Sequence, residues 1–207
     1  MRAPRWWDEQ ALPRLVDRAC SSREADRWRH SVCRGAGVRG TVLEFGFASG
    51  ANLPFYGDDV EQVLAVEPAD LAWERSAERR AAFGRPVTRI SRDAAAVDLP
   101  DRSVDAVVST WTLCTIPDLA GALAEAQRML RPEGGLHFVE HTMSPRPLLA
   151  AAQRGLQPVW GLWAGGCHLD RHIPAELDAA AYVIDRPVSA GWFLSGIGRP
   201  QQTNQYP

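Results

Sequence analysis

The chain contains no lysine, and all 23 of its basic residues are arginine. Chemistry that needs a lysine amine, such as Schiff-base formation, is therefore excluded. The formal net charge of -2 also lacks the positive excess that nucleic-acid binders carry, so we expect neither DNA nor RNA as a partner. No run of about 18 apolar residues is present, which predicts that no segment spans a membrane.

Closely spaced cysteine pairs, which mark redox and metal-binding motifs, are also absent. The four cysteines are far apart in the chain: Cys20, Cys33, Cys114 and Cys167. We predict free thiols in a reducing compartment. The basic, aromatic segment 1–7 is not followed by an apolar core, so it does not resemble a secretory signal. A cytoplasmic protein is expected, although Trp6 and Trp7 leave weak contact with a membrane surface open.

Length and composition fit one globular domain. The chain has 207 residues, of which 45% are hydrophobic and 23% are charged. We predict a single domain over 1–207. Its parts are an N-terminal helical region at 1–37, a cofactor-binding core at 38–147, and a substrate cover with the last strands at 148–207.

Short apolar runs alternate with amphipathic segments along the core. The predicted strands lie at 41–45, 63–67, 87–90, 105–110 and 136–139, with a further strand at 181–185. The predicted helices lie at 9–30, 71–83, 118–130 and 174–180. Asp70 is expected to cap the second of these helices. This alternation predicts an α/β fold with a doubly wound, mostly parallel sheet that helices cover on both faces.

The segment after the fifth predicted strand has a different pattern. Residues 148–163 have apolar side chains at helical spacing, but Pro158 interrupts the run. We therefore predict a helix-break-helix cover outside the α/β core. The tail from Gly191 is rich in glycine and proline, which predicts a weak last strand.

A glycine turn follows the first predicted strand. Such a turn at a strand's carboxyl end lets backbone N–H groups approach a ligand closely. Glu67 ends the second strand, 67 − 46 = 21 residues after Gly46, and a carboxylate at this distance can accept hydrogen bonds from a ribose diol. The alternative is that Glu67 caps the next helix. Asp93, after the third strand, either contacts an adenine amino group or forms a turn.

The segment from Leu43 to Asn52 resembles the S-adenosylmethionine (SAM) binding motif of class I methyltransferases, usually written (D/E)xGxGxG. Segments 92–94, 99–105 and 130–135 resemble other parts of the type-11 domain group of that family. The resemblance implies a Rossmann-like fold and SAM as cofactor. The cofactor-binding residues that it implies are Glu44, Gly46, Ala48, Gly50, Asn52, Glu67, Pro68, Asp93, Ala94 and Thr110.

One position departs from the family motif. Ala48 replaces the central glycine, and a non-glycine residue in the left-handed region costs about 1–2 kcal/mol. This departure keeps open a catalytically silent SAM-fold binding protein. A nicotinamide-dependent reductase is the weaker alternative, because its G-x-G-x-x-G fingerprint needs glycine where this chain has Ala51.

Within the type-11 group, the chain is similar to methyltransferase-like thiol methyltransferases and their bacterial relatives. The shared segments include 113–114, 140–141 and 166–171. The (D/N)PP(F/Y/W) motif of amino-methylating DNA and protein glutamine enzymes is missing after the fourth strand. We therefore predict methyl transfer to a small, partly apolar molecule, with a thiol first. Quinone, phenol-type or lipid acceptors are the alternatives.

Several residues are candidates for handling the methyl acceptor. His141, at the end of the fifth strand, is the predicted general base, and a structural histidine is the alternative. The predicted substrate residues are His141, Trp160, Cys167, His168 and Arg171. Cys167 would otherwise be a small buried hydrophobe, and Arg171 would otherwise pair with Asp170. His168, Asp170 and His172 have a chelating spacing, but methyl transfer from SAM needs no metal, so none is expected.

Overall fold

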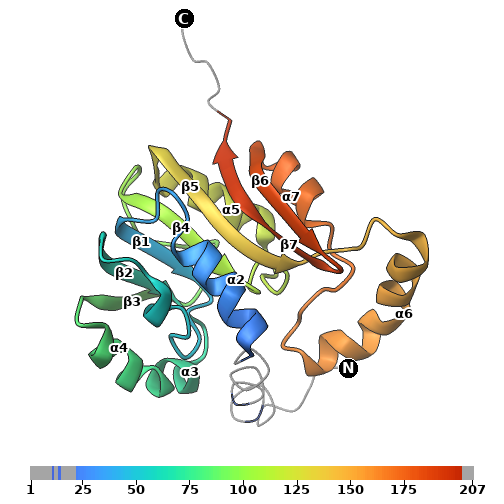
Figure 1. Ribbon diagram of the computed structural model, residues 1–207, viewed down its shortest axis with the longest axis horizontal. Coiled ribbons are helices and arrows are strands. Elements are labelled where there is room, and N and C mark those ends of the chain that lie inside the picture. Colours follow the sequence, from blue (N-terminus) through green and yellow to red (C-terminus); the bar gives the residue numbers. More distant parts are fainter. Residues whose placement is uncertain (1–10, 12–13, 15–21, 202–207) are drawn as a thin grey trace, which may run out of the picture.

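The computed structural model of the protein describes residues 11, 14 and 22–201. Seven strands of this part form one sheet in the order β3-β2-β1-β4-β5-β7-β6 (Figure 1). Their bounds are β1 Gly40–Phe45, β2 Val60–Val66, β3 Val87–Ser91, β4 Val104–Thr110, β5 Leu130–His141, β6 Tyr182–Ala190 and β7 Phe193–Pro200. The first five are parallel, and β7 runs antiparallel to both β5 and β6. The predicted α/β fold with a mostly parallel sheet is confirmed.

Helices cover both faces of this sheet. They are α2 Arg23–Cys33, α3 Asp70–Arg75, α4 Ala77–Phe83, α5 Leu119–Met129, α6 Pro147–Trp163 and α7 Ile173–Ala179, together with the 3₁₀ helix η2 Leu53–Phe55. Successive strand residues point to opposite faces. Leu43 accordingly packs in one core with α5 and α7, whereas Val42 packs in a second core with Cys33 of α2. None of the described helices is long and apolar enough to cross a membrane.

Two helix predictions need correction. The predicted helix 9–30 lies partly outside the described residues, and the observed helix runs from Arg23 to Cys33 with Ser22 as its cap. The predicted helix 71–83 is two helices, α3 and α4, which meet at Ser76. Asp70 is not the cap of α3, because Ala69 holds that position. The Asp70 carboxylate instead accepts from Arg89 of β3, at 2.7 Å, and from Arg92.

The predicted weak last strand is in fact the eight-residue strand β7, which is inserted between β5 and β6. Its glycines let neighbouring side chains approach, since a Cβ at Gly196 would lie 2.8 Å from the Ile184 side chain. The strand is stabilised by backbone hydrogen bonds to two partners, which do not depend on its side-chain pattern. Strand β5 is longer than the predicted strand 136–139, because it also includes residues 130–135.

The predicted helix-break-helix over 148–163 is wrong, because α6 is one helix that continues through Pro158. Proline lacks an N–H, but the carbonyl that loses its partner lies on an exposed helix, where water can bond to it. The helix projects beyond the sheet (Figure 1). Several apolar side chains of this predicted substrate cover are exposed, with Val159 at 58% and Trp163 at 54%.

A buried histidine on β5 makes the stability of the fold depend on pH. Burial of His137, and then the positive charge of Arg199, lowers the pKa of the imidazole from 6.5 to about 4. Below pH 6.5 the unfolded chain therefore takes up a proton that the folded chain does not, until the pH reaches about 4. The contribution of neutral His137 to the stability of the fold is fully present above pH 6.5. It is lost as the pH falls from 6.5 to about 4. The folded state should lose about 2 kcal/mol from this group between pH 7 and pH 5.

Urea unfolding of wild type and His137→Leu at pH 5, 6 and 7 measures this effect. The free energy of unfolding of wild type should fall relative to that of the variant by about 2 kcal/mol from pH 7 to pH 5. His30→Gln is the matched control, because His30 is exposed and should leave the wild-type slope intact. A difference between wild type and His137→Leu that stays constant with pH would contradict this assignment.

Candidate functional site

The turn after β1 lies where the sheet order reverses between β1 and β4, a position at which doubly wound folds bind ligands. Gly46 has φ 67° and Gly50 has φ 74°, which are left-handed values that favour glycine. A Cβ at Gly46 would also collide with the side chain of Thr112, in the loop after β4. Sequence and packing therefore both require glycine at the start of this turn.

Glu67 follows β2, and its carboxylate faces the glycine turn. One carboxylate oxygen accepts from the backbone N–H of Ala48 at 2.6 Å, and the other accepts from Ala69 at 2.8 Å. Burial raises the pKa of Glu67, while these two N–H groups oppose that shift. Each oxygen has a further lone pair, so the carboxylate can still accept from a ribose hydroxyl.

Ala48 adopts φ 48°, so the residue in the central glycine position of the motif does lie in the left-handed region. The turn keeps the conformation that glycine would give and carries the cost of a side chain in it. The hydrogen bond from its N–H to Glu67 fixes this conformation. The turn therefore carries a side chain at a backbone conformation that favours glycine.

Three predicted cofactor residues form one polar network below the turn. The side-chain nitrogen of Asn52 donates to Glu44 at 2.9 Å and to the Thr110 hydroxyl at 3.1 Å, and the Tyr56 hydroxyl donates to Glu44 at 2.7 Å. Burial raises the pKa of Glu44 to about 8, although the bonds from Tyr56 and Asn52 oppose the shift. Glu44 therefore holds Asn52 in place at the floor of the cleft.

The remaining predicted cofactor residues lie at the ends of β2 and β3. Asp93 is exposed, and its carboxylate accepts from the N–H of Ala95 at 2.9 Å, as expected of a turn aspartate. Ala94 is buried beside it. Pro68 is exposed, and its carbonyl accepts from Arg92 at 3.0 Å. Adenine recognition by Asp93 stays a prediction.

The cleft itself holds a cavity of about 110 Å³. Residues from four segments line it: Arg29, Glu44, Gly46, Phe47, Ala48, Ser49, Ala51, Asn52, Ala72, Arg75, Thr110, Trp111 and Thr112. Arg29 of α2 lies over the Trp111 ring, with its guanidinium carbon 5.1 Å from the ring centre. Small-molecule pockets usually measure about 300–1,000 Å³, so a ligand of SAM's size must displace some of these side chains.

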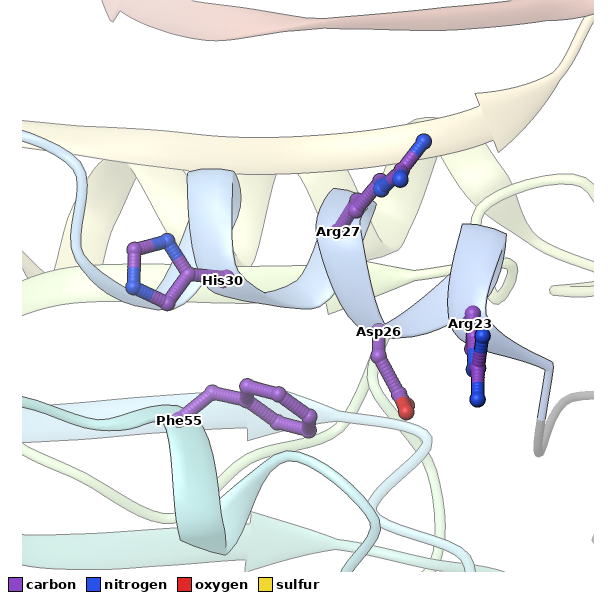
Figure 2. Close-up of a pocket in the computed structure, with 5 residues that line it drawn as sticks. All are labelled: Arg23, Asp26, Arg27, His30 and Phe55. Carbon is purple, nitrogen blue, oxygen red and sulfur yellow. The ribbon is translucent and has the colours of Figure 1, made fainter.

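A wider surface hollow of about 430 Å³ lies between α2 and η2 (Figure 2). Its lining is Arg23, Asp26, Arg27, His30 and Phe55. We place the site in the smaller cleft instead, because the glycine turn and the ends of β1 and β4 line it, and Glu67 accepts a hydrogen bond from Ala48 of that turn. The hollow contains none of these features.

A second cluster forms at the ends of β4 and β5. The Sγ atoms of Cys114 and Cys167 lie 3.5 Å apart, and each lies 3.6 Å from Nδ1 of His141. We refer to these three residues as the Cys–His cluster. Hydrogen bonds from Cys114, then His141 and Trp160, lower the pKa of Cys167, whereas the same bond and burial raise that of Cys114. The structure thus brings together two of the predicted substrate residues, His141 and Cys167, and adds Cys114.

Glu140 holds the loop that carries Cys114. Its buried carboxylate accepts from the Ser109 hydroxyl at 2.7 Å and from the backbone N–H groups of Thr112 at 3.0 Å and Cys114 at 3.2 Å. Burial raises its pKa, and these donors oppose the shift. Thr112 lines the cleft beside the glycine turn, so one carboxylate positions both the cleft wall and Cys114 of the Cys–His cluster.

The segment around Cys167 is held by α6 and by an arginine. The Gln157 side chain donates to the carbonyl of Cys167 at 3.1 Å and accepts from the N–H of Leu169 at 2.7 Å. Arg171 donates to the carbonyls of Leu113 at 2.6 Å and Ile116 at 2.9 Å. Arg171 therefore braces the loop after β4, and its contact with the substrate stays a prediction.

The histidines of the chelating pattern do not converge. His168 is exposed, with its Nδ1 3.9 Å from Asp170 Oδ1. His172 instead caps α7, where its Nδ1 accepts from the N–H of Ala175 at 3.1 Å. Sequence reasoning missed Cys114 and Arg29 as site residues. No local spacing signals either of them, because their partners come from other elements.

Comparisons with known proteins agree with this geometry. The methyltransferase domain family matches residues 43–138. Thiol S-methyltransferase TMT1B from Rattus norvegicus is 32% identical over 148 residues, which are 69% of this chain and 59% of that protein. Phosphatidylethanolamine N-methyltransferase from Cereibacter sphaeroides is 31% identical over 122 residues, which are 56% of this chain and 58% of that protein. The chain thus matches about three fifths of the length of these relatives.

A solved structure shows the same fold. A SAM-dependent methyltransferase from Aquifex aeolicus superposes with a TM-score of 0.64 at 17% identity, over 90% of this chain and 97% of that chain. The fold is Rossmann-like, as in class I SAM-dependent methyltransferases. The chain carries a methyltransferase domain of the type-11 group over residues 43–138, and this domain and fold imply SAM as the cofactor.

The strained position of Ala48 leads to a prediction on cofactor binding. Ala48→Gly removes a left-handed strain of about 1–2 kcal/mol and a methyl group at the closest approach of the turn. We expect the Kd for SAM, measured by titration calorimetry, to stay unchanged or to fall. Ala51→Gly in the same loop is the control, because Ala51 has no left-handed φ to relieve. A large loss of affinity in Ala48→Gly would mean that the Ala48 methyl packs as part of the site.

Proposed function

We propose that this protein transfers the methyl group of SAM to a small, partly apolar thiol. SAM carries its methyl group on a sulfonium, so the protein has to bind the cofactor, align the acceptor sulfur in line and exclude water. The glycine turn and Glu67 would hold the cofactor at the ends of β1 and β2. The acceptor would bind at the ends of β4 and β5.

The observation that carries this proposal is the Cys–His cluster, because its Cys114 lies on the loop after β4 whose Trp111 and Thr112 form a wall of the cleft. A free thiol has a pKa near 8.5, so only a few per cent is ionised at neutral pH, and the thiolate is the stronger nucleophile. His141 is the group that we propose promotes loss of the acceptor's proton. The rat relative, whose name states thiol S-methylation, supports the same choice of acceptor.

A comparison of acceptors with radiolabelled SAM tests the proposal. The purified chain is incubated in parallel with an alkyl thiol, a phenol or quinol of similar size, and vesicles that contain phosphatidylethanolamine. We expect label transfer chiefly to the thiol. Transfer to the phenol or quinol but to no thiol would replace the proposal by the quinone-type alternative, and SAM binding without transfer would favour the catalytically silent alternative.

A lipid acceptor is the second candidate, because α6 has an unusual apolar surface. Leu148 is 88% exposed, and Val159 and Trp163 are more than half exposed on the same helix. An exposed apolar helix near the acceptor residues suits an amphipathic molecule better than a sugar or nucleotide. The bacterial relative named for phosphatidylethanolamine N-methylation supports this candidate. Label in the vesicle lipid would establish it.

The thiol content bears on the surroundings of the protein. Cys33, Cys114 and Cys167 are buried free thiols. Thiols persist in reducing compartments, so we propose a cytoplasmic setting, with a small molecule rather than a nucleic acid as the binding partner.

A further inference from the structure

Three groups that bind transition metals meet in the Cys–His cluster, and they come from three separate parts of the fold. Cys114 lies in the loop after β4, His141 is the last residue of β5, and Cys167 follows α6. Their ligand atoms all lie within 4.8 Å of one another. From the sequence we expected no metal, and the chelating pattern we weighed was that of His168, Asp170 and His172. These residues do not form a three-ligand group in the described part of the chain.

The distances match the edges of a tetrahedron around zinc. Bonds of about 2.3 Å to sulfur and 2.0–2.1 Å to nitrogen imply edges of about 3.8 Å between two sulfurs and about 3.6 Å between sulfur and nitrogen. The observed edges are 3.5 Å between the sulfurs and 3.6 Å from each sulfur to Nδ1 of His141. A disulfide would instead require the sulfurs to approach to about 2.05 Å. We propose that Cys114, His141 and Cys167 bind one zinc ion and leave its fourth position open.

The charge of the three ligands and the hydrogen bonds that hold them both favour a zinc ion at this position. Two thiolates neutralise the charge of Zn²⁺ in a buried setting, which a single thiolate would not do. The backbone of Cys114 is held by the Glu140 carboxylate, and the carbonyl of Cys167 is held by Gln157. Such surrounding hydrogen bonds orient metal ligands. Cys114 and Cys167 are buried and His141 is partly exposed, so access to the cluster is from the side of His141.

The use of the open position rests on the proposed function. The sulfur of the acceptor thiol would bind zinc there and release its proton to water, because a coordinating thiol is deprotonated. A sulfur lone pair then attacks the sulfonium methyl carbon of SAM. The new carbon–sulfur bond forms as the old one breaks, and S-adenosylhomocysteine leaves with the bonding electron pair. The neutral thioether is a weaker ligand than the thiolate and dissociates. His141 thus promotes ionisation as a metal ligand.

Metal content and cobalt spectroscopy test the site without relying on activity. The full-length chain is purified with a reductant and analysed for zinc, and the metal-free protein is then titrated with Co²⁺. We expect about one zinc per chain, and the visible absorption of tetrahedral cobalt with thiolate-to-metal charge transfer in the near ultraviolet. Cys114→Ser and Cys167→Ser should each lose both signals. Cys33→Ser and His168→Ala are the matched controls and should keep both.

Two outcomes would overturn the site. One is that metal-free wild type fails to bind Zn²⁺ or Co²⁺ stoichiometrically, and the other is that both cysteine variants bind as wild type does. SAM binding by calorimetry shows whether each variant is folded. If a cysteine variant does not fold, His141→Ala gives a second test of the metal site. The experiments distinguish a failure of the proposed metal site from a failure of the proposed function. Stoichiometric zinc lost in the variants, without transfer to any thiol, leaves the site standing and removes thiol methylation.

Discussion

Replacing His141 with alanine should lower kcat for thiol methylation at pH 7 by about 100-fold or more, within the range that a proton-handling side chain contributes. The imidazole lies at the end of β5 with Nδ1 3.6 Å from the sulfurs of Cys114 and Cys167, beside the loop that forms the cleft wall. Without it, the protein must use the few per cent of acceptor that is already ionised at this pH. Initial rates with labelled SAM and an alkyl thiol measure the loss.

The pH dependence separates this role from a purely structural one. The ratio of the wild-type rate to the His141→Ala rate should shrink as pH rises past about 8.5, where the acceptor thiol ionises unaided. Calorimetry should show unchanged affinity for SAM. His30→Gln is the control, because His30 is exposed on α2 and outside the Cys–His cluster, and it should keep the wild-type profile. His141 has no part in acceptor ionisation if thiol methylation survives in His141→Ala with the wild-type profile.

Glu67→Ala should weaken SAM binding by about 10- to 150-fold, which corresponds to about 1.5–3 kcal/mol for a lost charged hydrogen-bond acceptor. The carboxylate lies at the end of β2 and holds the turn through Ala48, so its loss removes the ribose contact and loosens the turn together. Titration calorimetry with SAM measures the change. Glu61→Ala is the control, because Glu61 is exposed on the same strand and should bind SAM as wild type does.

A SAM analogue that lacks one ribose hydroxyl separates the two effects of Glu67. In wild type, removing the hydroxyl that Glu67 accepts from should cost affinity. In Glu67→Ala the same removal should cost little further, because partners in one hydrogen bond are not additive. If removing the hydroxyl lowers affinity equally in wild type and in Glu67→Ala, Glu67 acts only by holding the turn. Wild-type affinity for SAM in Glu67→Ala would remove Glu67 from the cofactor site altogether.

The sequence by itself determined the α/β class, the five parallel strands and the glycine turn. These follow from local patterns, because strand periodicity and left-handed glycine depend on neighbouring residues. The spacing of Gly46 and Glu67 was also sufficient to predict their meeting, since a strand–turn–helix–strand unit has a nearly constant length. The hydrogen bond from Ala48 to Glu67 confirms that they meet.

Only the tertiary structure decided the features that depend on distant partners. β7 forms because β5 and β6 supply hydrogen bonds on both of its sides, which outweighs its poor side-chain pattern. The helix α6 continues through Pro158 because its surface is exposed to water. Cys114 and Cys167 lie 167 − 114 = 53 residues apart in the chain but 3.5 Å apart between sulfurs. No periodicity or short motif encodes such a contact, because it exists only after the strands and α6 have packed.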